Sequence, residues 1–201
     1  MPLDPATSSE RKLQTHDRIL DTAAGVLRRD GFSGVGVADI MKRAGLTHGG
    51  FYAHFASRDA LLAAALERAG QDSQARLQRS LDQGEASAGN RFRALVQSYL
   101  SERHLRSPER GCPVAALASE MPRQSDEVRA AAAARVEALT ARVASTLGPA
   151  QPPEAAAIVA SHLVGALQVA RALGDNAKGR RHLEASRRFL LAQFDHPVPA
   201  A

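Results

Sequence analysis

Residues 41–58 combine cationic and imidazole side chains and contain no acidic residue. The side chains concerned are Lys42, Arg43, His48, His54 and Arg58. Ammonium and guanidinium groups bind the phosphate oxygens of nucleic acids, and imidazole N–H groups can donate hydrogen bonds to phosphates or base edges. This composition therefore predicts a surface that binds a polyanion such as DNA.

Patterns typical of enzymes do not occur in the sequence. We find no Gly-x-Ser-x-Gly, Walker or dinucleotide-binding motif, and the seven histidines are scattered rather than set at metal-ligand spacing. We therefore expect no enzymatic activity, no catalytic residues, no metal and no cofactor. A protein that coats DNA regardless of sequence needs an extended basic surface. The net charge of +5 and the three basic residues between positions 41 and 58 fit that class poorly.

Helical patterning predicts the elements that position these side chains. Apolar residues at helical spacing predict a first helix over about 15–30 and a second over about 37–44. A tight glycine turn leads to a third helix over about 48–54, with Thr47 as its N-cap. Two short helices joined in this way form a helix-turn-helix, whose second helix enters the major groove of DNA. Thr47 and His48 would then meet a phosphate or a base edge.

Two adjacent glycines lie inside the predicted third helix. Gly49 and Gly50 each cost about 1 kcal/mol in a helix relative to alanine. Either nucleic acid approaches the helix backbone closely here, or the segment is a loosely wound turn. We favour the first interpretation.

Three sequence blocks identify a family. Gly-Leu-Thr at 45–47, Phe-Tyr-x-His-Phe at 51–55 and Ser-Arg-Asp-Ala-Leu at 57–61 occur in this order. Together with the first helix, they make residues 15–66 resemble the tetracycline-repressor (TetR) family. The resemblance implies an all-helical dimer with three DNA-binding helices, a variable ligand-binding body and a double-stranded, near-palindromic DNA operator.

The resemblance also implies which residues contact DNA. The predicted set is Lys42, Thr47, His48, Gly49, Gly50, Tyr52, His54 and Arg58, with the side chains mainly on phosphates and the glycines facing base edges. His54 could instead pack beside Phe55. Arg58 near a helix start is electrostatically unfavourable unless an anion offsets it, which favours a phosphate contact. Gly36 and Ala38 depart from the family pattern, so phosphate contact and base readout by the second helix are in doubt.

The whole chain is predicted to be all-α, because its apolar residues are mainly Ala, Leu and Val, with only 4% aromatic residues. The expected units are a flexible arm (1–14), the helix-turn-helix DNA-binding domain (15–62), a ligand-binding and dimerisation domain (63–195) and a tail (196–201). A fourth helix is expected over about 57–81, with a loop over 84–89. One cysteine, no signal peptide and no apolar run near 20 residues predict a cytoplasmic protein without membrane contact.

The last two helices, about 153–173 and 177–194, are the dimer interface that the resemblance implies. Small and apolar residues surround the first of them nearly completely, as expected for a helix buried on two sides. An ordinary core helix within one chain is the alternative interpretation.

Candidate residues for binding an effector lie in the middle of the chain. They are Phe92, Val96, Tyr99, Cys112 and Met121. Cys112 follows a basic stretch that could lower the pKa of an exposed thiol, and some TetR regulators with a Gly-Cys corner respond to electrophiles. The alternatives are that Cys112 is a buried, inert thiol and that the apolar residues are plain core. We expect a repressor released by a small molecule or an electrophile. The sequence does not exclude an activator with the same architecture. It identifies neither the effector nor the operator sequence.

Overall fold

The computed structural model describes residues 8–88, 91–148 and 151–195. In this part of the chain every regular element is helical, which confirms the all-α prediction. The elements are α1 (Ser8–Asp30), α2 (Val37–Arg43), the 3₁₀ helix η1 (His48–Ala53), α3 (Arg58–Ala88), α4 (Arg91–Tyr99), α5 (Glu102–Arg106), η2 (Pro108–Arg110), α6 (Pro113–Leu117), η3 (Met121–Arg123), α7 (Asp126–Ala144), α8 (Ala155–Leu173) and α9 (Ala177–Phe194).

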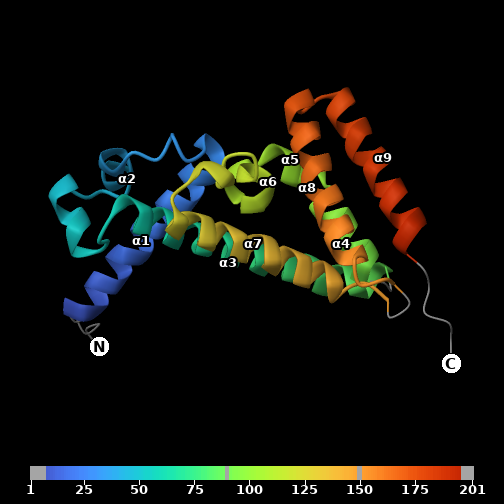
Figure 1. Ribbon diagram of the computed structural model, residues 1–201, viewed down its shortest axis with the longest axis horizontal. Helices are drawn as coiled ribbons and strands as arrows, with labels where there is room; N and C mark the ends of the chain where they lie inside the picture. The colour runs from blue at the N-terminus through green and yellow to red at the C-terminus, as the bar shows by residue number, and fades with distance from the viewer. Residues whose placement is uncertain (1–7, 89–90, 149–150, 196–201) are drawn as a thin grey trace, which may run out of the picture.

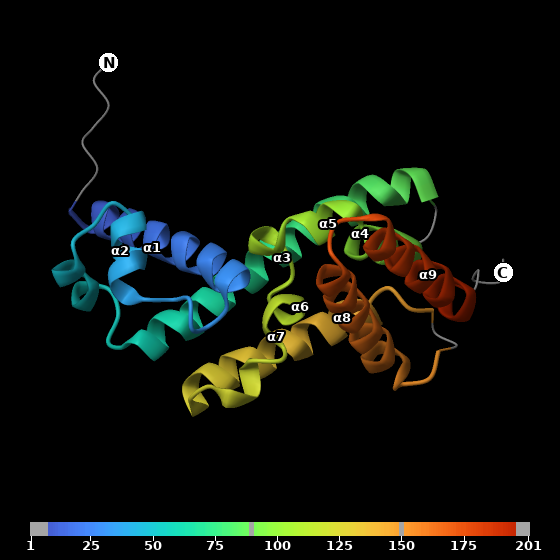
Figure 2. The same ribbon diagram turned by 90° about the horizontal axis from the view of Figure 1, so that it is seen from above.

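The molecule is elongated, with α3 and α7 side by side along its length (Figure 1). Helices α1 and α2 lie at one end, and α8 and α9 lie together at the other end in both views (Figures 1 and 2). The helix-turn-helix is thus far from the C-terminal helix pair, and α3 joins the two regions.

Two helix ends differ from the prediction. α1 begins at Ser8 rather than near position 15, so residues 8–14 are helical and not a flexible arm. Residues 1–7 of that arm and the tail 196–201 lie outside the described residues. α3 continues to Ala88 through most of the loop expected at 84–89. Extending an existing helix costs less than starting a new one, and the Glu and Ala residues there are good helix formers.

The hydrophobic core at the N-terminal end crosses the predicted domain boundary at residue 62. Side chains of α1, α2 and η1 pack there with Leu62 and Leu66 of α3. Leu117 of α6 and Val128 of α7 join the same cluster. Helices α1, α2 and η1 therefore share a core with the C-terminal body, so a movement in the body can reach them through packing.

Helix α8 is the most apolar helix of the C-terminal body. By length and composition alone it could cross a membrane, which corrects the expectation that the chain holds no such segment. Its buried residues include Val159, Leu163 and Leu167, which belong to the core cluster of the C-terminal body. The helix ends at Gly174, whose φ of 88° is a backbone conformation that suits glycine.

Candidate nucleic-acid interface and effector cavity

The segment expected to read DNA is a 3₁₀ helix, not the α-helix predicted over 48–54. Its first bond runs from the Gly50 N–H to the Thr47 carbonyl at 3.1 Å. Thr47 has the extended backbone of an N-cap, but its side chain makes no capping hydrogen bond, so the predicted cap is wrong in that respect. The tighter 3₁₀ winding suits a short segment in which two glycines weaken α-helix formation.

Phe51 anchors this segment in the core. Its ring is 2% exposed, lies 5.7 Å from the Phe55 ring, and meets the Tyr52 ring edge-on at 5.2 Å. The Tyr52 side chain points outwards and is 71% exposed. Beside it, Lys42, Thr47 and His48 are also exposed. An aromatic side chain this exposed but held at its base by a buried ring suits a contact with another molecule.

Nothing within the protein requires glycine at positions 49 and 50. A Cβ atom at Gly49 would meet no atom within 4 Å, and at Gly50 its nearest neighbour would be Met41 Cε at 3.6 Å, an ordinary contact. Neither residue has a positive φ. The fold itself therefore sets no steric requirement for glycine at these two positions.

His54 is partly buried beneath α1, with its ring 5.9 Å from that of His16. Its Nδ1 atom is buried and has no hydrogen-bond partner in the structure. Burial, followed by the nearby charges of His16 and Lys12, lowers the pKa of His54. Lys12 thus lies near His54, the residue that follows η1. Sequence analysis missed it because residues 1–14 were assigned to an arm, although the basic residues there were visible.

Arg58 binds the protein's own backbone. Its Nε donates to the Val35 carbonyl at 3.1 Å and one Nη donates to the Phe32 carbonyl at 2.6 Å. These carbonyl oxygens offset the unfavourable position of the guanidinium at the start of α3. A phosphate is therefore not needed to offset the charge of Arg58, and its predicted contact with DNA stays a prediction. Two of the five N–H donors of the guanidinium are used in this way, and they fix the loop that leads into α2.

Arg28 ties α1 to the C-terminal body. Its side chain is 3% exposed, and one Nη atom donates to the carbonyls of Ala69 at 3.2 Å and Gly111 at 3.4 Å. The other Nη lies 3.5 Å from an oxygen of Asp72. Burial lowers the pKa of Arg28, and the charge of Asp72 opposes that shift. Gly111 directly precedes Cys112, so this arginine joins α1 to the predicted sensing corner.

A cavity of about 360 Å³ opens between α3, α4, α5 and η2. It shares Tyr99 with a smaller cavity of about 50 Å³, which Cys112 also lines. Of the five predicted effector-binding residues, only these two line either cavity. Phe92 and Val96 are buried in the C-terminal core, and Met121 packs in the N-terminal core. Tyr99 and Cys112 belong to the same C-terminal core cluster, so burial alone does not separate the five residues, and their role in effector binding stays a prediction.

The Cys112 thiol is buried, whereas the sensor hypothesis expected it to be exposed. The His104 ring holds the corner: its Nδ1 lies 2.7 Å from the Tyr99 carbonyl, and its Nε2 accepts the N–H of Cys112 at 3.0 Å. Burial, with help from Arg171, lowers the pKa of His104 to about 4, so its ring is neutral near pH 7. Burial also raises the pKa of the Tyr99 hydroxyl, with Cys112 adding to the shift. The imidazole that holds the Cys112 N–H therefore carries no charge near pH 7, and Arg171 is a cation that acts on both Cys112 and Tyr99.

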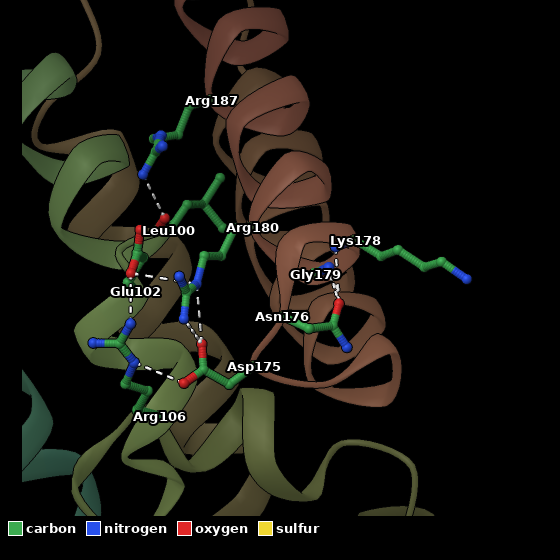
Figure 3. A network of polar contacts seen from close by, with 9 residues as sticks. All are labelled: Leu100, Glu102, Arg106, Asp175, Asn176, Lys178, Gly179, Arg180 and Arg187. Atoms are coloured by element: carbon green, nitrogen blue, oxygen red, sulfur yellow. Dashed lines mark hydrogen bonds and ion pairs between the residues drawn. The ribbon is translucent and has the colours of Figure 1, made fainter.

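Helix α5, which forms one wall of the larger cavity, is clamped to the start of α9. Asp175 accepts hydrogen bonds from Arg106 at 2.7 Å and from Arg180 at 2.9 Å, and Arg106 also bonds Glu102 at 2.7 Å (Figure 3). Hydrogen bonds from the two arginines lower the pKa of Asp175. On the same side of α9, Arg187 donates to the Leu100 carbonyl at 3.0 Å. The cavity wall and α9 are thus connected directly.

Comparison with protein families agrees with this arrangement. The family model "Bacterial regulatory proteins, tetR family" matches residues 19–65, and "Tetracyclin repressor-like, C-terminal domain" matches residues 88–186. The two matches together cover most of the chain. The chain belongs to the TetR family.

Among individual TetR proteins, the chain is 30% identical over 117 residues to the HTH-type transcriptional repressor NemR of Escherichia coli. That match covers 58% of this chain and 59% of NemR. The HTH-type transcriptional regulator CymR of Pseudomonas putida is 36% identical over 61 residues, 30% of either chain. The curated relatives are thus matched over less than two thirds of their length.

Solved TetR structures share the fold over nearly the whole chain. The crystal structure of E. coli NemR in its reduced form superimposes with a TM-score of 0.74 at 23% identity, covering 94% of this chain and 100% of that one. A TetR regulator from Chloroflexus aurantiacus gives a TM-score of 0.71 at 20% identity, covering 91% and 96%. These similarities confirm the N-terminal helix-turn-helix and the helical C-terminal body.

Proposed function

We propose that this protein represses transcription by binding a near-palindromic DNA operator as a homodimer in the cytoplasm, and that an effector releases it. The carrying observation is the exposed surface at α2 and η1, where Lys42, Thr47, His48 and Tyr52 surround an open backbone at Gly49. Cationic and hydroxyl groups around a backbone without side chains can follow the phosphates and approach the bases.

Phosphate contacts and base readout are assigned to different residues. Lys42, Thr47 and Tyr52 have the chemistry of phosphate contacts, while His48 at the start of η1 can reach a base edge. We add Lys12 of α1 to the phosphate group because it lies near His54. His54 and Arg58 are assigned mainly to positioning, since one is partly buried and the other binds two backbone carbonyls.

Exposed apolar side chains on α8 and α9 support a dimer interface within residues 153–194. They are Ile158, Val169, Leu173 and Phe189, each more than 40% exposed. Phe189 also stacks on His162, with ring centroids 5.3 Å apart. A group of large apolar side chains at one end of a chain is typical of an association surface. A two-fold dimer would set the two DNA-reading segments about one turn of DNA apart, roughly 34–36 Å, or a small stretch beyond it.

Release from DNA is assigned to the cavity beside Tyr99. Its wall includes Gly111, whose carbonyl binds the buried Arg28 of α1. A ligand that displaces this wall would therefore disturb α1 directly. Modification of Cys112 by an electrophile would act on the same wall, but the reagent must enter through the cavity of about 50 Å³.

Footprinting on the DNA upstream of the protein's own gene tests the proposal. We expect a protected near-palindrome, a dimer by sedimentation at micromolar concentration, and higher expression of a reporter when the protein is absent. No protection would contradict operator binding, a monomer would contradict the dimer, and lower reporter expression in the absence of the protein would contradict repression.

A gel shift with and without a quinone then compares the wild type with Cys112→Ser. Equal release from both proteins would assign the thiol a structural role and leave a non-covalent effector.

A further inference from the structure

The cavity beside Tyr99 is lined by four arginines. Arg76 and Arg79 come from α3, Arg103 from α5 and Arg110 from η2. The other lining residues are Ser73, Leu77, Ser80, Ser98, Tyr99, Ser101, His104, Ser107 and Gly111, so no carboxylate lines the cavity. His104 is neutral near pH 7 because burial lowers its pKa. The charges that face the cavity are therefore all positive.

These arginines are poorly neutralised by the protein itself. Within the described residues, no ion pair or side-chain hydrogen bond involves Arg79, Arg103 or Arg110. Arg76 lies 3.8 Å from Asp72, a carboxylate that also serves Arg28, and its Nε is buried without a hydrogen-bond partner. Arg79, Arg103 and Arg110 are exposed to solvent, and cationic groups that line one cavity together attract an anion.

DNA is not the anion that this cluster fits. Helix α3 begins at Arg58, and Arg76 lies about 27 Å further along the helix axis. The recognition segment η1 immediately precedes that start. A duplex held by η1 would therefore not reach the cavity. The volume of about 360 Å³ instead falls within the range of small-molecule sites, roughly 300–1,000 Å³.

We propose that the cavity binds a small organic anion, whose oxyanion is held by Arg79, Arg103 and Arg110 and whose body packs on Leu77 and Tyr99. Guanidinium groups bind carboxylate and phosphate oxygens in the same planar geometry, so the shared chemistry is the oxyanion. The serine hydroxyls around the cavity can orient further polar groups of the ligand. The inference rests on the proposed function only in taking this anion to be the effector.

Isothermal titration calorimetry on the full-length protein without DNA tests the inference. The probes are salicylate, its uncharged analogue salicylamide and inorganic phosphate, at fixed ionic strength. The variants are Arg79→Gln and Arg103→Gln, and the matched control is Arg129→Gln, which removes the same charge from an exposed site on α7. We expect salicylate or phosphate to bind with a dissociation constant below about 10 mM. We expect salicylamide and both cavity variants to bind at least about tenfold more weakly, and the control to match the wild type.

Tighter binding of salicylate would identify an organic carboxylate, and tighter binding of phosphate a phosphorylated ligand. Failure of both anions to bind, equal binding of salicylamide, or unchanged binding by the two cavity variants would overturn the proposal.

A gel shift on the footprinted DNA separates this result from the proposed function. Release of operator by salicylate or phosphate would support the anion as effector. Anion binding without release would overturn that role, whereas a protein that binds no DNA would contradict the proposed function alone.

Discussion

Replacing the buried Arg28 should destabilise the protein substantially, because its guanidinium joins three elements. One Nη atom bonds the carbonyls of Ala69 and Gly111 at 3.2 and 3.4 Å. A hydrogen bond to a charged group contributes about 1.5–3 kcal/mol, and the lower value applies because 3.2 Å lies at the upper limit of the usual N–H···O distance and 3.4 Å lies beyond it. The Nε atom also bonds the Ala24 carbonyl of its own helix at 3.0 Å. Taking about 1.5 kcal/mol for each of the two bonds that join different elements, Arg28→Ala should lower the free energy of unfolding by at least about 3 kcal/mol.

Urea denaturation at fixed protein concentration measures this loss, since the stability of a dimer depends on concentration. At about 2–4 °C per kcal/mol for a chain of this size, the melting temperature should also fall by about 6–12 °C. Arg28→Met keeps most of the side-chain packing and should lose somewhat less. The neighbouring Arg29→Ala is the control, because Arg29 is exposed and its salt bridge is with Asp30. A loss below about 1 kcal/mol for Arg28→Ala, or one no larger than that of Arg29→Ala, would refute the reasoning.

Three other features lead to measurable outcomes. Gly31→Ala should cost about 2 kcal/mol in urea denaturation, because φ is 76° and the new Cβ would lie 2.6 Å from Glu120 Oε1; an unchanged midpoint would contradict this. The free energy of unfolding should fall as pH drops from about 6.5 to about 4, because the unfolded chain protonates His104 first; His104→Gln should flatten that fall. In gel-shift competition, Tyr52→Phe should weaken binding to all DNA alike, whereas His48→Ala should change the preference among operator variants. Equal losses on specific and random DNA would assign His48 to the backbone.

The family, the helical fold and the recognition segment were predictable because they depend on local patterns. Phe51 and Phe55 had to be buried, which left Tyr52 facing outwards, and the structure agrees. The end of α3 was not predictable, since Gly84 reads as a loop residue and only the favourable extension of an existing helix overrides it.

Contacts between segments that are distant in the sequence could not be predicted from local patterns. Arg58 looked like a phosphate ligand because the carbonyls of Phe32 and Val35 that it binds are assembled only by folding. Met121 could not be separated from a pocket residue, because the core cluster that buries it draws residues from several distant helices, among them α1, α3 and α7. The arginines of the cavity are likewise spread over three elements and do not form a motif.

The length of α3 has a mechanical consequence. The helix lines the cavity beside Tyr99 near Arg76 and begins at Arg58, with four residues between it and the end of η1. A tilt of about 5° about the cavity would move the start of the helix by roughly 2–3 Å over the intervening 27 Å or so. In a two-fold dimer both protomers would move oppositely, so the spacing of the two recognition segments would change by up to about 5 Å. The period of DNA is fixed, so a small rotation at the cavity would be amplified into a mismatch with the operator.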